Sequence, residues 1–271
     1  MKNSRFNENL QPDHLVAYID LLGWKCKLLS AKTHADIAPL INVLKRFHGD
    51  FDFDYAKRLT PHEKESVGEQ IEILSDALVV VLSLNSGNAC LHGQYEEIRL
   101  KFWDFALAQA QCAMDGVFIR GGVAHGYCVK GEGVLLSDAL VKAYVLEECT
   151  ATYPVIAVSD ELYEYWRGLP FYDKEEAALY TTVGTRENGA KFRFIDYINV
   201  TLGILQGESH GMSEVEFLTR HKAALINEIH NVRFTDNDDK EKEKVLNKYE
   251  WLKRYHDKYA VEFGRELCFE A

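Results

Sequence analysis

The sequence predicts an α+β fold with a βαββαβ core. Three observations predict it: strand and helix patterns follow one another in that order, residues 14–21 alternate like a strand with one fully apolar face, and residues 69–83 read as two successive strands. The chain has 271 residues, of which 47% are hydrophobic and 27% charged. That balance is typical of a globular protein with a substantial core.

The first strand candidate runs from His14 to Leu21. Every second side chain from Leu15 to Leu21 is apolar, whereas the other face includes Tyr18 and Asp20. We expect the apolar face to lie under helices and the mixed face to line a cleft. A helix with apolar residues from Ile37 to Phe51 should follow, and the polar residues 52–69 should form a loop.

The remaining core elements follow in order. "EQIEILSDALVVVLS" predicts two strands that reverse near Ser75 and Asp76, and a helix with an apolar stripe from Ile98 to Cys112 comes next. "GVFIRGGVAHG" predicts a glycine-rich strand. "SDALVKAYVLEECTA" predicts a helix capped by Ser137 or Asp138, and "YPVIAVS" predicts a short strand. This order matches a ferredoxin-like core whose sheet is covered by helices on one face.

We expect residues 1–160 to form this core and residues 161–271 to form an extension packed on it. Within the extension, "DELYEYWRGL" looks helical, and residues 179–201 predict a hairpin that turns near 187–189. Two charged helices should close the chain, joined by "DNDDKEKEK" as a solvated connection.

Composition excludes several classes of protein. No apolar run reaches the length of a membrane span, and the polar first residues do not resemble a signal peptide, so we expect a cytoplasmic protein. The six cysteines are scattered without metal-ligand spacing and should be reduced thiols. The net charge of −11 disfavours binding to nucleic acid.

Two aspartates point to chemistry. Asp20 ends the first strand, and Asp76 lies at the tip of the hairpin expected to pair beside it. Two adjacent carboxylates repel each other unless a cation lies between them, and hard oxygen ligands suit Mg²⁺ or Mn²⁺ shared with phosphate oxygens. Either residue could instead be an ordinary cap or turn former.

The segment "LLGWK" after Asp20 leads from strand to helix. Such a turn presents free backbone N–H groups to a phosphate, and Gly23 lets the backbone come close. The carboxylates would then face the metal ions and the N–H groups would face the phosphates.

The motifs "YIDLLGW", "LSDALVVV", "FIRGGVAHG", "SDALVKAYVLE" and "YPVIAVS", together with "KYEWLKRYHDKYA" near the end, resemble the class III nucleotidyl cyclases. The closer resemblance is to the bacterial pyrimidine cyclases of Pycsar anti-phage defence. It covers about residues 13–160, and the order and spacing of the motifs are more specific than any one of them.

The resemblance implies a homodimer with its sites at the interface, a nucleoside triphosphate substrate and two Mg²⁺ or Mn²⁺ ions per site. It implies that Asp20, Asp76 and the carbonyl of Leu21 bind metal and that Leu22, Gly23 and Trp24 cradle the triphosphate. The product would be cyclic UMP or cyclic CMP, with uridylate cyclase favoured over cytidylate cyclase. That messenger would reach a separate effector, with no nucleic-acid or membrane partner.

The sequence departs from this family in two places. The positions of a catalytic Asn and Arg in adenylate and guanylate cyclases correspond here to Val141 and Val145, and Glu72 lies near the position of a purine-selecting Lys. These differences fit a pyrimidine cyclase, and they also fit an enzyme that has lost activity.

Cyclisation develops negative charge on the phosphoryl oxygens, so a cationic donor is expected. Arg120, on the glycine-flanked strand, is the first candidate, and a surface salt bridge is its alternative; Lys142 is a weaker candidate. Tyr18 could stack on the ribose or base, or be a core aromatic. We interpret His125 as structural because two metal ions make a histidine base unnecessary.

Two other functions stay open. The chain could be a catalytically inactive nucleotide sensor on the same fold, or a dimeric interaction module that works through its tyrosine-striped last helix. Retention of both aspartates favours the enzyme.

Overall fold

The structure is a computed structural model, and its elements follow the predicted strand and helix order in the core. It describes residues 13–51, 68–74, 76–131, 134–186, 188–207, 211–234 and 239–269. The predicted loop at 52–69 therefore lies almost wholly outside the described residues, as do Ser75 and Glu187 at the two predicted hairpin turns. In chain order the elements are β1 (His14–Leu21), α1 (Trp24–Ser30), α2 (His34–Phe51), β2 (Glu69–Leu74), β3 (Ala77–Ser83), α5 (Gly87–His92), α6 (Gln94–Met114), β4 (Ile119–Gly126), β5 (Cys128–Gly131), β6 (Val134–Ser137), α7 (Asp138–Cys149), β7 (Ile156–Val158), α8 (Asp160–Arg167), α9 (Lys174–Tyr180), β8 (Thr181–Thr185), β9 (Lys191–Ile195), α10 (Tyr197–Leu205), α11 (Glu214–Arg233), α12 (Asp239–Ala260) and the short 3₁₀ helix η1 (Arg265–Leu267).

The main sheet has seven strands in the order β2-β3-β1-β4-β7-β9-β8. β4 and β7 are parallel and the other neighbours are antiparallel, so the sheet is mixed. This arrangement confirms the α+β fold class and places β1 at the centre, between the hairpin strand β3 and the glycine-rich strand β4. The predicted hairpin in the extension, β8–β9, continues this sheet through β7.

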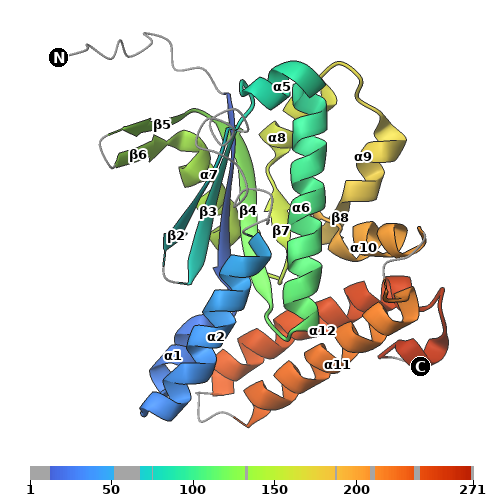
Figure 1. Cartoon of the computed structure of the whole chain (residues 1–271). Coiled ribbons are helices and arrows are strands. Elements are labelled where there is room, and N and C mark those ends of the chain that lie inside the picture. The colour runs from blue at the N-terminus through green and yellow to red at the C-terminus, as the bar shows by residue number, and fades with distance from the viewer. Residues whose placement is uncertain are drawn as a thin grey trace.

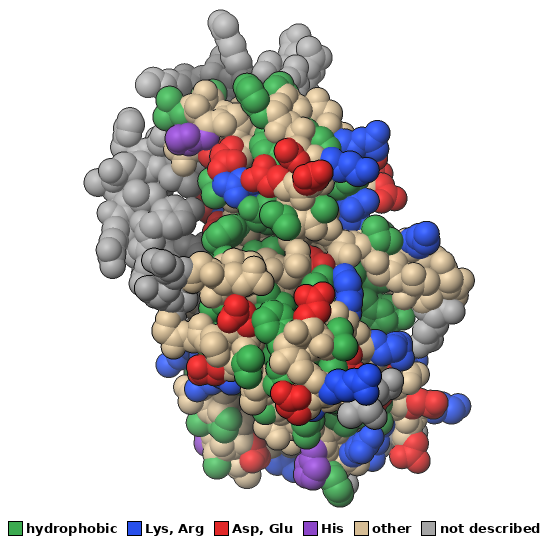
Figure 2. Space-filling model, turned by 90° about the vertical axis from the view of Figure 1, so that its right-hand side faces the viewer, with side chains coloured by type: hydrophobic (Ala, Val, Ile, Leu, Met, Phe, Trp, Pro, Cys, Tyr) green, Lys and Arg blue, Asp and Glu red, His purple; other side chains and the backbone are tan. Residues whose placement is uncertain are grey.

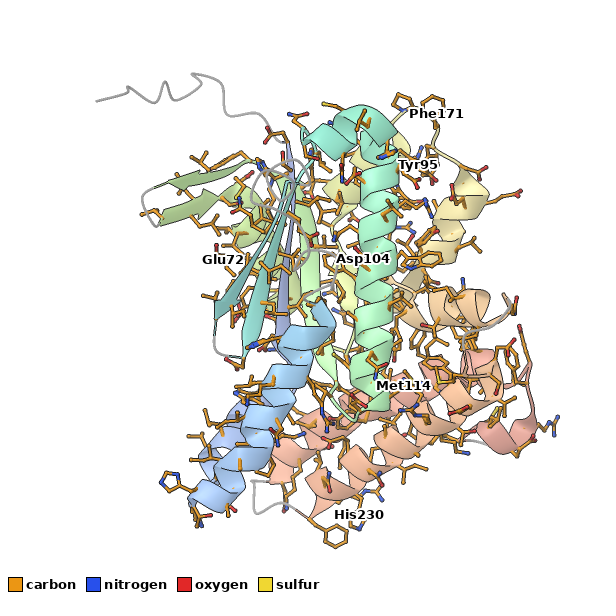
Figure 3. The ribbon with its side chains drawn as sticks, viewed as in Figure 1. Glu72, Tyr95, Asp104, Met114, Phe171 and His230 are labelled. Carbon is orange, nitrogen blue, oxygen red and sulfur yellow. The ribbon has the colours of Figure 1, made fainter. Side chains whose placement is uncertain are left out.

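The apolar face of β1 is buried as expected. Leu15, Ala17 and Ile19 are fully buried and belong to one large core, which also holds Phe47 of α2 and Phe102 of α6. Figure 1 shows α6 running along this side of the sheet. Figure 3 shows Tyr95 near the start of α6 and Met114 at its end, so this helix spans the length of the sheet.

The opposite face is not open, which corrects the prediction of helices on one face only. α7 packs there against β1 and β4, and Ala139 joins Val16 and Val79 in a second apolar cluster. The approach is close because β4 has glycine at position 122: a Cβ there would lie 2.2 Å from the carbonyl oxygen of Ala143. Gly122 therefore permits α7 to lie directly on the strand.

Three local features differ from the sequence prediction. A two-stranded arm, β5–β6, separates β4 from α7. It was not predicted because its strands have only four residues each and are too short to show a clear hydrophobic period. Residues 197–205 form α10 rather than the end of a strand, with Asp196 as its N-cap. The last helix already begins at Asp239, inside the stretch predicted as a connection.

The extension ends in the helix pair α11 and α12, which lies across the lower end of the sheet and α6 in Figure 1. On the face that carries α9 and α10, acidic and basic side chains are interspersed rather than gathered by sign (Figure 2). Among the helices that the structure describes, none combines the length and apolar character needed to span a bilayer.

Candidate active site

The two predicted metal-binding aspartates lie at the same end of neighbouring strands. β1 pairs antiparallel with β3, so that Asp20 lies opposite Ala77, and Asp76 directly precedes that residue. The N–H of Leu21 donates to the carbonyl oxygen of Asp76 at 3.2 Å. The backbone thus ties the two segments together where the carboxylates leave the sheet.

The electrostatics of Asp20 fit a cation site. Burial raises the pKa of its carboxyl group, Arg120 opposes that rise, and the negative charge of Asp76 adds to it. The Asp20 side chain is 19% exposed, so its charge is only partly solvated. A carboxylate that lacks full solvation and faces a second carboxylate gains from a divalent cation, and the two residues therefore fit the metal ions implied by the resemblance. Across the described ranges, no group of three or more His, Cys, Asp or Glu side chains is arranged to hold a metal ion.

Arg120 lies opposite Asp20 on β4 and joins it to a further carboxylate. Its Nη2 donates to Asp20 Oδ2 at 3.3 Å, and its Nε lies 2.6 Å from Glu147 Oε1 of α7. Glu147 is nearly buried, with 4% of its side chain exposed, and burial raises its pKa. The guanidinium is therefore held between two carboxylates rather than in a surface salt bridge.

Tyr18 lies on the same face of β1 as Asp20. Its ring meets that of Tyr144 on α7 edge to face, with centroids 5.3 Å apart. Burial, followed by the charge of Asp20, raises the pKa of Tyr18 to about 12, so the phenol stays neutral at physiological pH. The two rings form an aromatic wall beside the carboxylates.

The turn after Asp20 has the conformation that its glycine suggests. Gly23 adopts a left-handed φ of 75° and precedes α1, and its carbonyl accepts from the N–H of Lys27 at 3.2 Å. The N–H of Leu22 donates to the carbonyl of Phe118 at 2.9 Å, so it is engaged within the protein. The first N–H groups of a helix lack partners within the helix, and those at Trp24 onward are the ones the turn can offer to a phosphate. The side chains of Leu21, Leu22 and Trp24 are buried in the core.

The other predicted residues lie outside the group formed by Asp20, Asp76 and Glu147 around Arg120, which we term the carboxylate cluster. Lys142 pairs with Asp138 at 2.9 Å and donates to the carbonyl of His125 at 3.3 Å. The ring of His125 stacks on Tyr165 with centroids 3.9 Å apart, in agreement with a structural role. Glu72 lies on the edge strand β2, as Figure 3 shows.

Val141 and Val145 point away from the sheet and are 62% and 48% exposed. Several other large apolar side chains are exposed on the neighbouring elements β2 and β6. Together with the two valines, those on the side of the sheet that carries Asp20 define what we term the outer apolar set: Leu74, Val134, Leu136, Val141 and Val145.

Sequence reasoning missed three members of the site, Tyr144, Glu147 and Lys248. The buried stripe of α7 consists of Ala139, Ala143 and Glu147 at intervals of four, and that spacing could have marked Glu147 as facing the sheet. Lys248 comes from α12, and no sequence signal places this helix near β4. Burial and the nearby charge of Arg120 lower the pKa of Lys248.

Of the comparisons with known proteins, only the one with solved structures finds similar proteins. No protein-family model matches the chain, and no curated protein matches it. Among solved structures, the chain is similar to the adenylyl cyclase CyaB from P. aeruginosa, with 15% identity and a TM-score of 0.40 over 68% of this chain and 93% of that one. It is also similar to a bacterial light-regulated adenylyl cyclase, with 12% identity and a TM-score of 0.38 over 73% of this chain and 99% of that one.

Proposed function

We propose that this protein is a nucleotidyl cyclase that converts a pyrimidine nucleoside triphosphate, UTP in preference to CTP, into the 3′,5′-cyclic monophosphate and pyrophosphate. The observation that carries the proposal is the placement of Asp20 and Asp76 at one end of the paired strands β1 and β3, directly before a glycine-containing turn into a helix. The sequence resemblance supplies the reaction class and the preference for a pyrimidine.

In this proposal the chain's own residues divide the work. Asp20, Asp76 and the carbonyl of Leu21 hold two Mg²⁺ or Mn²⁺ ions, and the turn of Leu22, Gly23 and Trp24 holds the triphosphate, with N–H donation from Trp24 onward. When bound, the ions lower the pKa of the ribose 3′-hydroxyl and neutralise charge on the leaving pyrophosphate. Tyr18 and Tyr144 offer a surface on which the ribose or base can stack.

Arg120 is proposed as the cationic donor to the phosphoryl oxygens. A guanidinium has five N–H donors, and the contacts with Asp20 and Glu147 engage only part of this set. Lys248 lies in the same cluster and adds positive charge from the extension.

We propose that the outer apolar set is the surface through which two copies associate. Exposed apolar side chains that gather on one side of a protein indicate an interaction surface. The set flanks the side of β1 that carries Asp20, so association there would enclose a nucleotide. Val141→Asp together with Val145→Asp should shift the protein from dimer to monomer in sedimentation, whereas Ile226→Asp, at a 48% exposed position on α11, should not. A dimer that survives the double change contradicts this surface.

A second candidate function is a nucleotide sensor without turnover. The valines at positions 141 and 145 favour it, because polar donors of related cyclases are missing there. A sensor would act through nucleotide binding alone. A cyclase would instead release a cyclic nucleotide, which would activate a separate effector in defence against phage.

The test is incubation of the purified protein with each of the four NTPs and Mn²⁺, with the products resolved by mass. We expect a cyclic pyrimidine monophosphate and equimolar pyrophosphate, both lost in Asp20→Ala and in Asp76→Ala. Thermal stabilisation by UTP and Mn²⁺ without product would favour the sensor. A main product of cyclic AMP would contradict the pyrimidine preference, and equal turnover by the aspartate variants would contradict the mechanism.

A further inference from the structure

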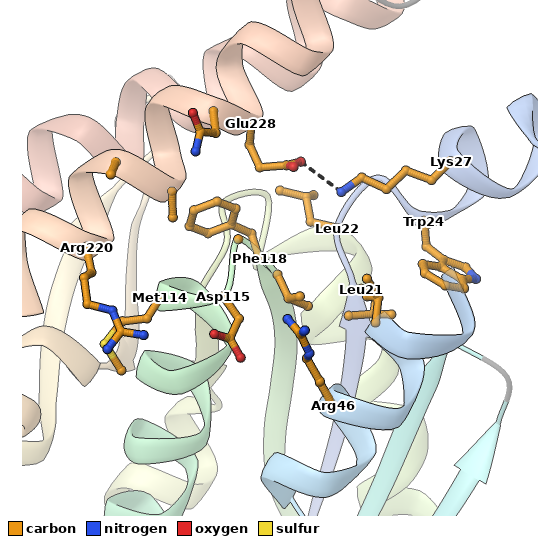
Figure 4. Close-up of a pocket in the computed structure, with 16 residues that line it drawn as sticks. Leu21, Leu22, Trp24, Lys27, Arg46, Met114, Asp115, Phe118, Arg220 and Glu228 are labelled. Atoms are coloured by element: carbon orange, nitrogen blue, oxygen red, sulfur yellow. Dashed lines mark hydrogen bonds and ion pairs between the residues drawn. The ribbon is translucent and has the colours of Figure 1, made fainter. Parts of the chain in front are cut away.

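A cavity of about 490 Å³ lies beneath the turn that follows Asp20. It is bounded by that turn, by α2, by the end of α6 and by α11 (Figure 4). Successive side chains of a strand point to opposite faces, and Leu21 lines this cavity whereas Asp20 faces α7. The cavity is therefore distinct from the carboxylate cluster, and the turn of Leu21, Leu22 and Trp24 lies between the two.

The walls of the cavity combine apolar side chains with a few charges. The apolar part is supplied by Leu21, Leu22, Val43, Met114 and Phe118. A volume of this size that joins apolar side chains to a small number of convergent polar groups is typical of sites for small molecules. At the rim, a Cβ on Gly116 would meet no other atom within 4 Å, so the backbone here borders open space.

The charges in the cavity leave positive groups available. Lys27 and Glu228 pair with each other at 2.9 Å, which offsets one cation with one carboxylate. Arg46 and Arg220 remain, and in the view of Figure 4 they approach from two sides with Asp115 between them. No ion pair within the described residues joins Asp115 to either arginine. Arg220 makes a long contact with a sulfur atom, 3.9 Å from its Nη1 to Met212 Sδ, and no carboxylate among the described residues forms an ion pair with it.

Arg46 and Arg220 both line this partly apolar cavity, and both residues are exposed, so their charged groups are accessible to a ligand that enters from solvent. A guanidinium binds carboxylate and phosphate oxygens through paired N–H groups. An anion that also carried an apolar body would satisfy both parts of the cavity at once.

We propose that this cavity is a binding site for a small amphipathic anion, with an aromatic or aliphatic body against Leu22, Val43 and Phe118 and a carboxylate or phosphate group bound by Arg46 and Arg220, whose two positive charges exceed the single negative charge of Asp115. The wall formed by Leu21, Leu22 and Trp24 is also the turn that we assign to the triphosphate. A ligand that packs against this wall restrains the turn and so promotes nucleotide binding on its other side. That consequence rests on the proposed cyclase function, whereas the binding site itself does not.

The experiment is calorimetric titration of the full chain, without nucleotide or divalent metal, using 1-naphthyl phosphate and 1-naphthoate as probes. We expect one site per chain for at least one probe, and the pair tells whether phosphate or carboxylate is preferred. Arg46→Gln and Arg220→Gln should each weaken binding roughly tenfold, because each removes a charged hydrogen-bond donor. Lys45→Gln and Arg233→Gln are matched controls on the same two helices, outside the cavity lining, and should bind like the wild type.

Two further measurements distinguish binding in this cavity from binding elsewhere on the chain. Ala223→Leu narrows the cavity without changing its charge, at an exposed position that tolerates a larger side chain, and should also weaken binding. The Asp20→Asn, Asp76→Asn protein should bind both probes normally, so a failure of the cyclase assignment leaves this test intact. The proposal is overturned if neither probe binds, or if the Arg46→Gln, Arg220→Gln protein binds as tightly as the wild type.

Discussion

Polar groups are shielded from solvent both at the end of β1 that carries Asp20 and in the C-terminal layer formed by α10, α11 and α12. The two regions differ in whether these groups find complementary partners within the chain. At the end of β1, Asp20 and Asp76 bring like charges together; burial and the charge of Asp76 raise the pKa of Asp20, and Arg120 offsets that rise only in part. In the C-terminal layer, buried polar groups meet complementary partners. The difference suggests that the first region requires something from outside the chain, whereas the second stabilises the fold.

The C-terminal layer contains a continuous chain of hydrogen bonds. His256 Nε2 lies 3.1 Å from the carbonyl of Leu267, its Nδ1 lies 3.0 Å from His221 Nδ1, and His221 Nε2 lies 2.7 Å from the hydroxyl of Tyr197. Because the carbonyl can only accept, His256 donates to it, His221 donates to His256, and Tyr197 donates to His221. Each ring is then neutral with one proton, in agreement with the lowered pKa of both histidines.

A second set of hydrogen bonds surrounds Asp196. Its carboxylate accepts from Tyr255 at 2.6 Å, from Tyr259, and from the N–H of Asn199 at the start of α10. Only 2% of Asp196 is exposed. This carboxylate therefore links α10 to α12 with its hydrogen-bonding capacity well used, unlike Asp20.

The largest effect that would test the comparison is on turnover. Asp20→Asn should reduce cyclase activity roughly a thousandfold, because it removes a ligand of the ions that stabilise the transition state. The same change removes a partly desolvated charge beside Asp76 but also weakens the contact with Arg120, and because these two effects oppose each other we expect the melting temperature to change little. Activity assays and calorimetry on one protein sample measure both. A large loss of stability would mean that Asp20 serves the fold.

The next effect is on stability alone. Asp196→Ala should lower the free energy of unfolding by roughly 3 kcal/mol, because the buried hydroxyl of Tyr255, the partly buried hydroxyl of Tyr259 and a helix N-terminus lose their acceptor. Asp173→Ala is the matched control, since Asp173 also caps a helix, α9, but is exposed; it should cost only about 1 kcal/mol. Urea unfolding measures both values. Equal losses would contradict the role given to burial.

The smallest effect concerns pH. Since the folded chain holds His221 and His256 neutral, the unfolded chain binds more protons below the ordinary histidine pKa of about 6.5. Their contribution to stability is present above that pH and is lost as the pH falls, by up to about 1.4 kcal/mol per pH unit for each histidine.

Denaturant unfolding at pH 7.5 and at pH 5.5 tests this pH dependence. His221→Gln should flatten the profile, whereas His230→Gln, at an exposed position on α11, should leave it unchanged. An identical profile in the His221 variant would show that the histidines do not carry the effect.

The same contrast explains what the sequence could predict. The strand patterns of residues 14–21 and 69–83, together with the βαββαβ order of the core, were enough to predict that β1 pairs with β3, and that pairing brings Asp20 to Asp76. The position of α7 was harder, because its buried stripe is Ala139, Ala143 and Glu147, with little apolar signal. Glu147 consequently escaped notice as the partner of Arg120.

The C-terminal network lay further beyond sequence reasoning. In the sequence, His221 and His256 look like solvent-facing residues on charged helices and Asp196 lies in the predicted hairpin; only their partners from separate elements make them buried. Long-range pairing of polar groups has no periodicity, so hydrophobic patterns cannot reveal it. The apolar stripes of α11 and α12 showed which faces pack, but not that polar side chains complete them.

The most direct measurement is the number of Mn²⁺ ions bound per chain in the presence of 3′-deoxy-UTP, which lacks the attacking hydroxyl and cannot be cyclised, counted by electron paramagnetic resonance. The wild type should bind two ions, and Asp20→Asn and Asp76→Asn should each lose tight binding while remaining folded. Two tightly bound ions in both variants, with wild-type affinity, would contradict the assignment of these aspartates as the metal ligands.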